Sequence, residues 1–180
     1  MIELQLELFP GHIAGLLLVE LSKPVEDFAS IFIQGTWECA LLDAGVVFHK
    51  SQLLTAVNVA FQRFEAGRLK THSLHNEVML ALSAKLSIRD GLAAVRFSWE
   101  KTRCLVVAVD PPASFPQAAE STSNALAAKV RHFPEGANEL FNELLVHVDK
   151  PSIQNLYGTD IDPHWICTKI ATVEYVRQLR

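Results

Sequence analysis

The sequence predicts one α+β domain in which a small, mostly antiparallel β-sheet packs with several α-helices. Three observations support this prediction. Two apolar segments, 2–8 and 13–20, follow each other with only a short turn between them, and a third apolar run covers 104–109. Most remaining segments space their apolar side chains three and four residues apart, as helices do. A chain of 180 residues is long enough for one well-filled core, so we assign 1–180 to a single domain.

The first two segments predict a β-hairpin. Residues 2–8 alternate strictly between apolar and polar side chains, which indicates a half-buried strand. Residues 13–20 include consecutive apolar side chains and indicate a strand that is buried more completely. Because Phe9-Pro10-Gly11 make the connection short, we expect the two strands to pair antiparallel.

The chain beyond the hairpin predicts two helices and a short strand. Pro24 can occupy the first turn of a helix that stops at Gly35. Residues 46–48 are apolar and indicate a short strand. Ser51 can then cap a helix whose apolar spacing continues to Gly67.

A basic turn at 68–73 precedes two further predicted helices, 74–82 and 88–96. Ser87 and Asp90 resemble a capping box at the start of the second. The first helix is apolar on more than one face, so it is either deeply buried or docks a partner.

The last part of the chain predicts one more strand followed by helices. The run 104–109 ends at two prolines and reads as a central strand. Helices are expected in 117–130 and 139–147, and a last one begins at Asp162-Pro163, with the aspartate as its cap. The pattern leaves the strand order open.

Charge is unevenly distributed. The net charge of −4 argues against a general nucleic-acid binder, but residues 63–103 contain eight Lys and Arg against four Asp and Glu. The flanking segments 1–62 and 104–180 are both acidic. The middle segment is therefore either a local patch for a phosphate backbone or a set of scattered, solvated side chains. The mean hydropathy of +0.19 likewise fits a large core or an apolar docking face.

Cysteine usage and the start of the chain bear on location. Cys39, Cys104 and Cys167 are odd in number and widely spaced, as expected for reduced thiols in a reducing compartment. The acidic, alternating start differs from a signal or transit peptide, and no apolar run reaches the roughly 18 residues of a membrane helix. We expect a protein of the cytoplasm and nucleus that does not enter a membrane.

Catalytic motifs are absent from the sequence. It contains no Gly-rich phosphate loop, no Cys-x-x-Cys pair and no Gly-x-Ser-x-Gly elbow. His72 and His75 could share a helix face, but a metal site usually needs a third ligand. His49 and Asp110 lie at predicted strand or loop ends, where a catalytic group could sit. The alternative hypothesis is therefore a small metal- or nucleotide-dependent enzyme using His49, Asp110 or the His72/His75 pair; the main hypothesis needs no cofactor.

Binding is better supported than catalysis. Arg63, Arg68, Lys70 and His72 fall between two predicted helices, at a turn exposed by Gly67. Such a turn can offer backbone N–H groups and cationic side chains to phosphate. The alternative is a solvated connector.

Several short motifs follow one another along the chain: Leu6-Glu7-Leu8-Phe9-Pro10, Gln34-Gly35-Thr36, Lys70-Thr71-His72-Ser73-Leu74, a helix ending at Leu82-Ser83, Ile88 to Leu92, the strand 104–109, and Tyr157 before the last helix. This order resembles the TPRKB family, the small kinase-binding subunit of the EKC/KEOPS complex, which makes threonylcarbamoyl-adenosine in transfer RNA. The resemblance is close over 4–110 and looser beyond. Three positions depart from the family pattern: His72 replaces an arginine, Arg96 a glycine and Ala84 a proline.

The resemblance implies a non-enzymatic subunit, monomeric when isolated. It would bind the amino-terminal lobe of a small atypical kinase/ATPase and hold the 3′ CCA end of tRNA, supporting modification of the adenosine beside the anticodon. It implies Lys70 as the best RNA contact, supported by Arg68 and His72. Kinase contacts would come from outward residues of 74–82, 88–96 and 163–178; Met79, Arg89 and Ile170 are the candidates. Because His72 replaces a permanent charge, kinase docking without RNA binding is a further possibility.

Overall fold

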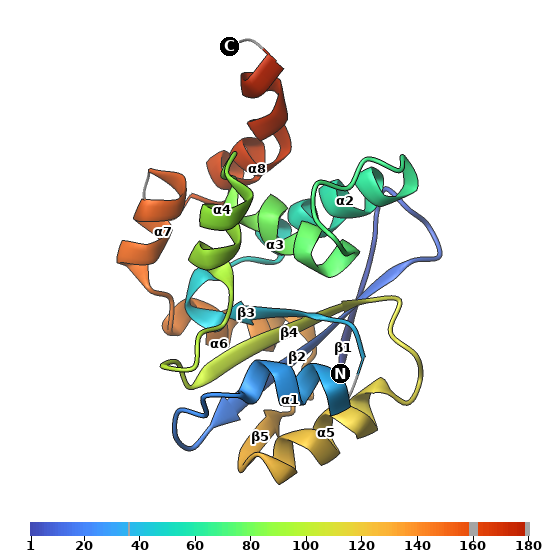
Figure 1. Ribbon diagram of the computed structural model, residues 1–180, viewed down its shortest axis with the longest axis vertical. Coiled ribbons are helices and arrows are strands. Elements are labelled where there is room, and N and C mark those ends of the chain that lie inside the picture. The colour runs from blue at the N-terminus through green and yellow to red at the C-terminus, as the bar shows by residue number, and fades with distance from the viewer. Residues whose placement is uncertain (36, 159–161, 179–180) are drawn as a thin grey trace.

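The computed structural model describes residues 1–35, 37–158 and 162–178, and the side chains through 173. Thr36, part of one motif used above, lies outside the described residues. A five-stranded sheet forms the middle layer of the fold (Figure 1). Its strands are β1 Ile2–Gln5, β2 Ile13–Leu21, β3 Ala40–Asp43, β4 Arg103–Val109 and β5 Ala128–Arg131.

The sheet is built around β2 and β4. The order is β1-β2-β4-β3, and β5 pairs with the second half of β2, next to the part that pairs with β1. All these pairings are antiparallel. The predicted hairpin is confirmed, with Ile2 opposite Leu16 and Gln5 opposite Ile13, and so is the central position of the third apolar run.

Helices cover both faces of the sheet. In Figure 1, α1 and α5 lie on one side, and α2, α3, α4 and α8 lie on the other. The helices are α1 Phe28–Gly35, α2 Lys50–Glu65, α3 Leu74–Ser83, α4 Ile88–Val95, α5 Phe115–Ala125, α6 Ala137–Val146, α7 Lys150–Tyr157 and α8 Pro163–Gln178, with a short 3-10 helix at Ala44–Val46. The predicted single-domain α+β class is therefore confirmed in its architecture. No helix in the described ranges is long and apolar enough to cross a bilayer.

The strand period of two divides the interior into two cores. Leu16 and Leu18 of β2 join the core beneath α2, α3, α6, α7 and α8, whereas Leu17 and Val19 join the core shared with α1 and α5. The residues of β4 alternate in the same way. A one-residue slip of either strand would exchange these sets, so burial on both faces fixes the register.

Several predicted elements are correct. Helices 74–82 and 88–96 correspond to α3 and α4, and Ser87 caps α4 by accepting from the Asp90 N–H at 3.3 Å. Asp162 caps α8 as expected, since its carboxylate accepts from the His164 and Trp165 N–H groups. Gly35 ends α1.

Other predictions are wrong at their boundaries. Helix α1 begins at Phe28 rather than Pro24, because its buried stripe starts only with Phe28 and Phe32. The cap of α2 is His49 rather than Ser51; its imidazole accepts from the Ser51 N–H. A helix over 117–130 is also wrong: Ala127 has φ 54°, which ends the helical path, and the chain returns as β5 along β2.

The predicted strand at 46–48 is wrong as well. The Gln52 side chain takes the backbone groups that a neighbouring strand would have used. Its amide nitrogen donates to the Val46 carbonyl at 2.9 Å, and its oxygen accepts from the Phe48 N–H at 3.1 Å. The strand of this region is instead β3, which pairs with β4.

Candidate nucleic-acid interface

The loop between α2 and α3, residues 66–73, carries the predicted RNA contacts. Helix α2 ends in a Schellman motif, in which the Gly67 N–H donates to the Phe64 carbonyl at 3.0 Å and the Arg68 N–H to the Arg63 carbonyl at 2.8 Å. Gly67 has φ +62°, a conformation that glycine adopts without strain. The predicted stop at Gly67 is therefore confirmed, and it directs the chain into the 66–73 loop.

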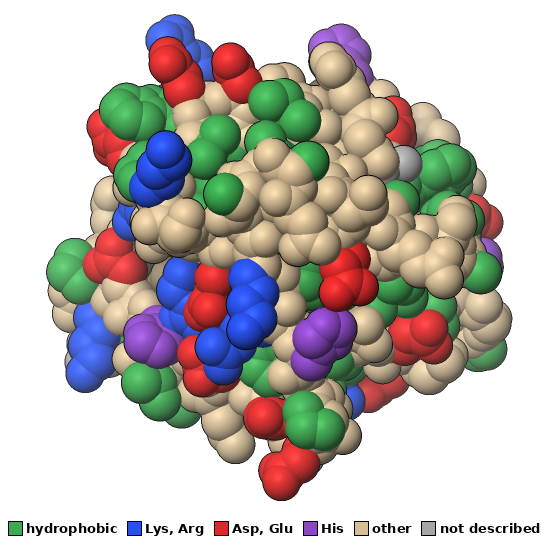
Figure 2. Space-filling view, turned by 90° about the horizontal axis from the view of Figure 1, so that it is seen from below, with side chains coloured by type: hydrophobic (Ala, Val, Ile, Leu, Met, Phe, Trp, Pro, Cys, Tyr) green, Lys and Arg blue, Asp and Glu red, His purple; other side chains and the backbone are tan. Residues whose placement is uncertain are grey.

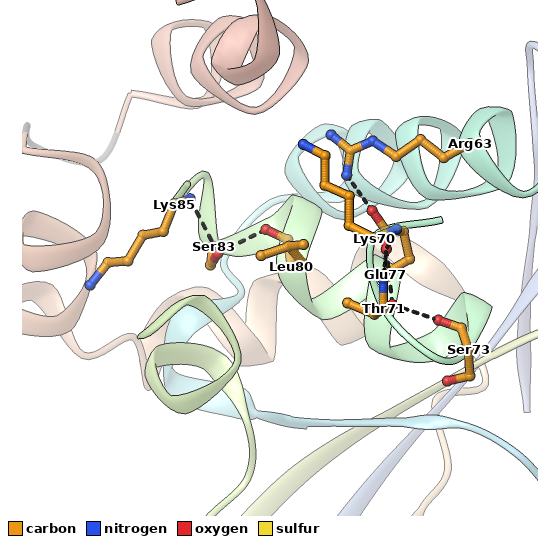
Figure 3. A network of polar contacts seen from close by, with 8 residues as sticks. All are labelled: Arg63, Lys70, Thr71, Ser73, Glu77, Leu80, Ser83 and Lys85. Atoms are coloured by element: carbon orange, nitrogen blue, oxygen red, sulfur yellow. Dashed lines mark hydrogen bonds and ion pairs between the residues drawn. The ribbon is translucent and has the colours of Figure 1, made fainter. Parts of the chain in front are cut away.

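A buried carboxylate organises this loop. Glu77, in the first turn of α3, has no exposed surface. One of its oxygens accepts from Arg63 Nη1 at 2.6 Å. The other accepts from the Lys70 and Thr71 N–H groups, each at 3.0 Å, and lies 2.9 Å from the Thr71 hydroxyl (Figure 3). A carboxylate with this many donors is well compensated for its burial.

The same loop leads into a capped helix. The Ser73 hydroxyl accepts from the Asn76 N–H at 3.2 Å, which satisfies one of the free donors at the start of α3. The Thr71 hydroxyl also lies 3.0 Å from the Ser73 carbonyl. The loop and the first turn of α3 are thus one hydrogen-bonded unit.

This arrangement corrects two expectations. The N–H groups of Lys70 and Thr71 point inward to Glu77, so they are not the donors that a phosphate would meet. Arg63 lies in the last turn of α2, buried and paired with Glu77, rather than on the turn. The loop presents the exposed side chains of Arg68 and His72 and the half-buried side chain of Lys70. Sequence reasoning missed Glu77; an acidic residue in a helix that is apolar nearly all round was the available signal.

The predicted kinase contacts are only partly at the surface. Arg89 is exposed on α4. Met79 is 4% exposed and Ile170 is fully buried, so the expectation that both point outward is wrong. Helix α3 is enclosed by its neighbours, which confirms the deeply buried interpretation of its apolar faces. The large apolar side chains that are exposed in this layer instead include Phe64, Leu86, Ile88 and Trp165.

The residues proposed for the enzyme alternative make contacts that stabilise the fold. His49 caps α2. The Asp110 carboxylate lies 2.6 Å from His12 Nδ1 and accepts from the Ile13 N–H at 2.9 Å, which ties the end of β4 to the start of β2. No group of three His, Cys, Asp or Glu side chains that could hold a metal occurs among the described residues.

The His72/His75 pair is divided between solvent and core. His72 is exposed, whereas His75 is 7% exposed and its Nε2 accepts from the Val109 N–H at 3.2 Å. Burial lowers the pKa of His75 to about 4, so the ring is neutral and its proton lies on Nδ1. Nδ1 is 4.0 Å from the Glu38 carboxylate, beyond hydrogen-bond range.

Tyr157, the residue matched to a tyrosine before the last helix, is a core residue. It is 1% exposed; its hydroxyl donates to the Leu82 carbonyl and accepts from Gln52 Nε2. Burial raises the pKa of this hydroxyl well above its ordinary value. Tyr157 therefore joins α7 to the start of α2 and the end of α3, away from the 66–73 loop.

The cysteines are free thiols, as the sequence predicted. Cys39 and Cys104 are buried, and desolvation raises the pKa of Cys39 to about 12 and that of Cys104 well above its usual value. Both thiols are protonated and unreactive at neutral pH.

The underside of the molecule in Figure 1 differs in charge from the 66–73 loop. Figure 2 shows blue and red side chains interleaved on this face. Beside α6, on the sheet face that also bears Leu16 and Leu18, Arg103 lies 3.2 Å from Glu20 and 2.8 Å from Glu143, and Arg131 lies 3.3 Å from Glu20. Paired charges of this kind offer little net field to a polyanion.

Comparison with known proteins bears on the family resemblance noted in the sequence. Residues 23–176 match the family model described as "Kinase binding protein CGI-121". The chain is 34% identical over 73 residues to the EKC/KEOPS complex subunit cgi121 of Aspergillus fumigatus, covering 41% of this chain and 39% of that protein. It is 28% identical over 74 residues to the subunit of the same name from Schizosaccharomyces pombe, covering 41% and 42%.

A vertebrate protein is similar over a longer stretch. The EKC/KEOPS complex subunit TPRKB of Danio rerio is 28% identical over 104 residues, covering 58% of this chain and 59% of that protein. The matched segments thus span about two-fifths to three-fifths of these relatives. The family model spans most of the chain, and the resemblance to TPRKB is confirmed: this chain belongs to the CGI-121 family of kinase-binding proteins.

Proposed function

We propose that this protein is a non-enzymatic subunit of a KEOPS complex that docks on the small atypical kinase/ATPase and holds the 3′ CCA end of tRNA. In this role it supports threonylcarbamoyl-adenosine modification of the adenosine beside the anticodon. The observation that carries the proposal is the match of residues 23–176 to a kinase-binding family, together with relatives named as EKC/KEOPS subunits. The free thiols are in keeping with the proposed location in cytoplasm and nucleus.

The proposed kinase surface lies on α4 and α8. Because Met79 of α3 and Ile170 of α8 are buried, docking must use other side chains, which α4 and α8 supply. Ile88 is 41% exposed, Trp165 is 46% exposed, and Arg89 adds a charge beside Ile88. Exposed aromatic, aliphatic and arginine side chains are the usual anchors of protein interfaces.

Co-elution with the small KEOPS-type kinase, measured by size exclusion with mass determination, tests this part. We expect a one-to-one complex, and we expect Ile88→Asp or Trp165→Asp to weaken it by about tenfold or more. Ile33→Asp is the matched control, since Ile33 is 42% exposed on α1 in the opposite layer. Separate peaks at micromolar concentration for the unaltered pair would refute kinase docking.

The proposed RNA surface is the 66–73 loop. Arg68, Lys70 and His72 place cationic groups on one connection, and phosphate contacts of this kind give affinity that falls with salt. Lys70→Glu should weaken tRNA binding while the fold and kinase binding are kept. Lys129→Glu, an exposed lysine on β5, is the matched control.

The CCA end is tested separately from the rest of the tRNA. Intact tRNA should bind more tightly than the same tRNA trimmed of its CCA end. Equal affinity for both, or for Lys70→Glu and the unaltered protein, would argue that this lineage retains kinase docking without RNA binding.

A further inference from the structure

We infer that Glu77 is a positioning residue for the RNA-binding loop: its carboxylate fixes the backbone from which Lys70 and its neighbours reach phosphate. The inference rests on the proposed function and adds a residue that never touches the ligand. Glu77 has no exposed surface, so its effect on binding must pass through the 66–73 loop.

The geometry gives the two carboxylate oxygens different tasks. Oε1 accepts from Arg63 Nη1 at 2.6 Å, and this ion pair neutralises the buried charge. Oε2 accepts from the Lys70 and Thr71 N–H groups and lies within hydrogen-bond distance of the Thr71 hydroxyl. The second oxygen is the one bonded to the backbone of the loop (Figure 3).

Two consecutive amides held by one atom fix the peptide plane between them. The Lys70 Cα and the direction in which its side chain leaves the backbone are then set by α3, a buried helix. The downstream side is fixed as well, because Ser73 caps the same helix. The cationic side chains are therefore carried by an ordered loop, which lowers the conformational entropy lost on binding.

The ion pair between Arg63 and Glu77 also affects the electrostatic field at the loop. An unpaired carboxylate beneath the loop would oppose the field of Arg68 and Lys70. With Arg63 as its partner, Glu77 holds the loop without cancelling that field.

Because the two oxygens act separately, a matched pair of double variants separates loop positioning from the ion pair. In Arg63→Met/Glu77→Gln, the glutamine oxygen can take the place of Oε2, so the loop keeps its acceptor and no charge is buried. In Arg63→Met/Glu77→Leu, the acceptor is lost as well. Both double variants lack the ion pair, so they differ only in whether residue 77 can accept from the Lys70 and Thr71 N–H groups.

The measurements are tRNA affinity across a salt series and hydrogen exchange at the Lys70 and Thr71 amides. The glutamine variant should stay within about threefold of the unaltered protein and keep both amides protected. The leucine variant should bind about tenfold more weakly, with a salt slope reduced by about one and both amides exchanging rapidly. Tyr157→Phe, which loses core hydrogen bonds remote from the loop, controls for lowered stability and should bind normally.

The outcomes separate this inference from the proposed function. If both double variants bind equally while Lys70→Glu weakens binding, Glu77 does not position the loop and the inference is overturned. If the unaltered protein does not bind tRNA, the RNA part of the proposed function fails, and the inference fails with it. Equal weakening by Tyr157→Phe would also overturn it, because the effect would then be one of stability.

Discussion

The two connections at the ends of α3 are anchored in different ways. At the N-terminal end, the 66–73 loop is held by the charged, buried Glu77, whose partner Arg63 comes from another helix. At the C-terminal end, residues 84–87 are held by the neutral Ser83 hydroxyl, which donates to the Leu80 carbonyl at 2.8 Å and accepts from the Lys85 N–H at 3.2 Å. Figure 3 shows both anchors on the same helix.

The difference lies in what each anchor allows. A carboxylate with several donors holds a loop at hydrogen-bond distance while the loop's side chains remain in solvent. A hydroxyl makes fewer bonds, so the second connection depends on close packing: a Cβ added at Gly91 of α4 would lie 2.7 Å from Ser83 Oγ. One connection is therefore sensitive to charge and the other to volume.

Loss of the charged anchor should have the largest effect. Glu77→Leu removes the carboxylate that pairs with the buried Arg63 and accepts from two loop amides, so we expect the free energy of unfolding to fall by about 3–5 kcal/mol. Ser83→Ala, the equivalent change at the other end, should cost only about 1 kcal/mol. Urea denaturation of both variants checks this, and similar losses would contradict the comparison.

Ala84→Pro should be the next most damaging change. Ala84 has φ 50°, and its N–H donates to the Ala81 carbonyl. Proline fixes φ near −65° and has no N–H, so we expect a loss of about 3 kcal/mol or more, although relatives are expected to have proline here. Ala84→Gly, which adopts this φ freely, should change the unfolding free energy by less than about 1 kcal/mol. A proline variant as stable as the unaltered chain in thermal denaturation would show that this connection adapts.

His75, at the end of α3 next to the 66–73 loop, should make the free energy of unfolding depend on pH. Burial lowers the pKa of His75 to about 4, below the roughly 6.5 of the unfolded chain. The unfolded state therefore binds the proton first, and stability present above pH 6.5 is lost as pH falls towards 4. This loss is on the order of 3 kcal/mol at most.

His75→Gln provides the comparison for this effect, because a glutamine oxygen can accept from the Val109 N–H without titrating. Unfolding free energies measured from pH 7 to pH 4 should fall less steeply in the variant. Parallel curves would exclude His75 as the source.

The smallest of these effects tests packing at the second connection. Gly91→Ala places a methyl group 2.7 Å from Ser83 Oγ and 2.9 Å from Leu80 Cδ1. The clash outweighs the gain in helix propensity, for a net loss of about 1–2 kcal/mol. Adding Ser83→Ala should recover part of it, whereas the same addition to Gly67→Ala should recover nothing. Additive losses in this double-mutant cycle would contradict a direct contact.

Much of the fold could be predicted from local pattern. The hairpin, α3, α4 and the cap of α8 carry their signals within a few residues: alternation, helical spacing, Ser87 and Asp162. The failures were decided by distant partners. Residues 46–48 are satisfied by the Gln52 side chain, and β5 exists because β2 has an open half-edge.

The candidate site was predicted in part for the same reason. The cations of the 66–73 loop could be read from the sequence, but their anchor could not, because Arg63 and Glu77 meet only when α2 and α3 pack together. Met79 and Ile170 were misplaced because a helix covered on several sides carries no sequence mark of an outward face.

The pairing of β2 with β4 has a consequence for synthesis of the protein. Leu18 lies opposite Leu105 in the centre of the sheet, so about 90 residues must be synthesised after β2 before its partner β4 is complete. At ribosomal rates of roughly 5–20 residues per second, the edge of β2 that pairs with β4 stays open for about 5–20 s, although β1 can already pair with the other edge. We expect a chain ending at residue 102 to be digested rapidly by proteases. Resistance of that fragment would show that β2 is buried before β4 is synthesised. The strand at the centre of the finished molecule is thus among the most vulnerable parts of the nascent one.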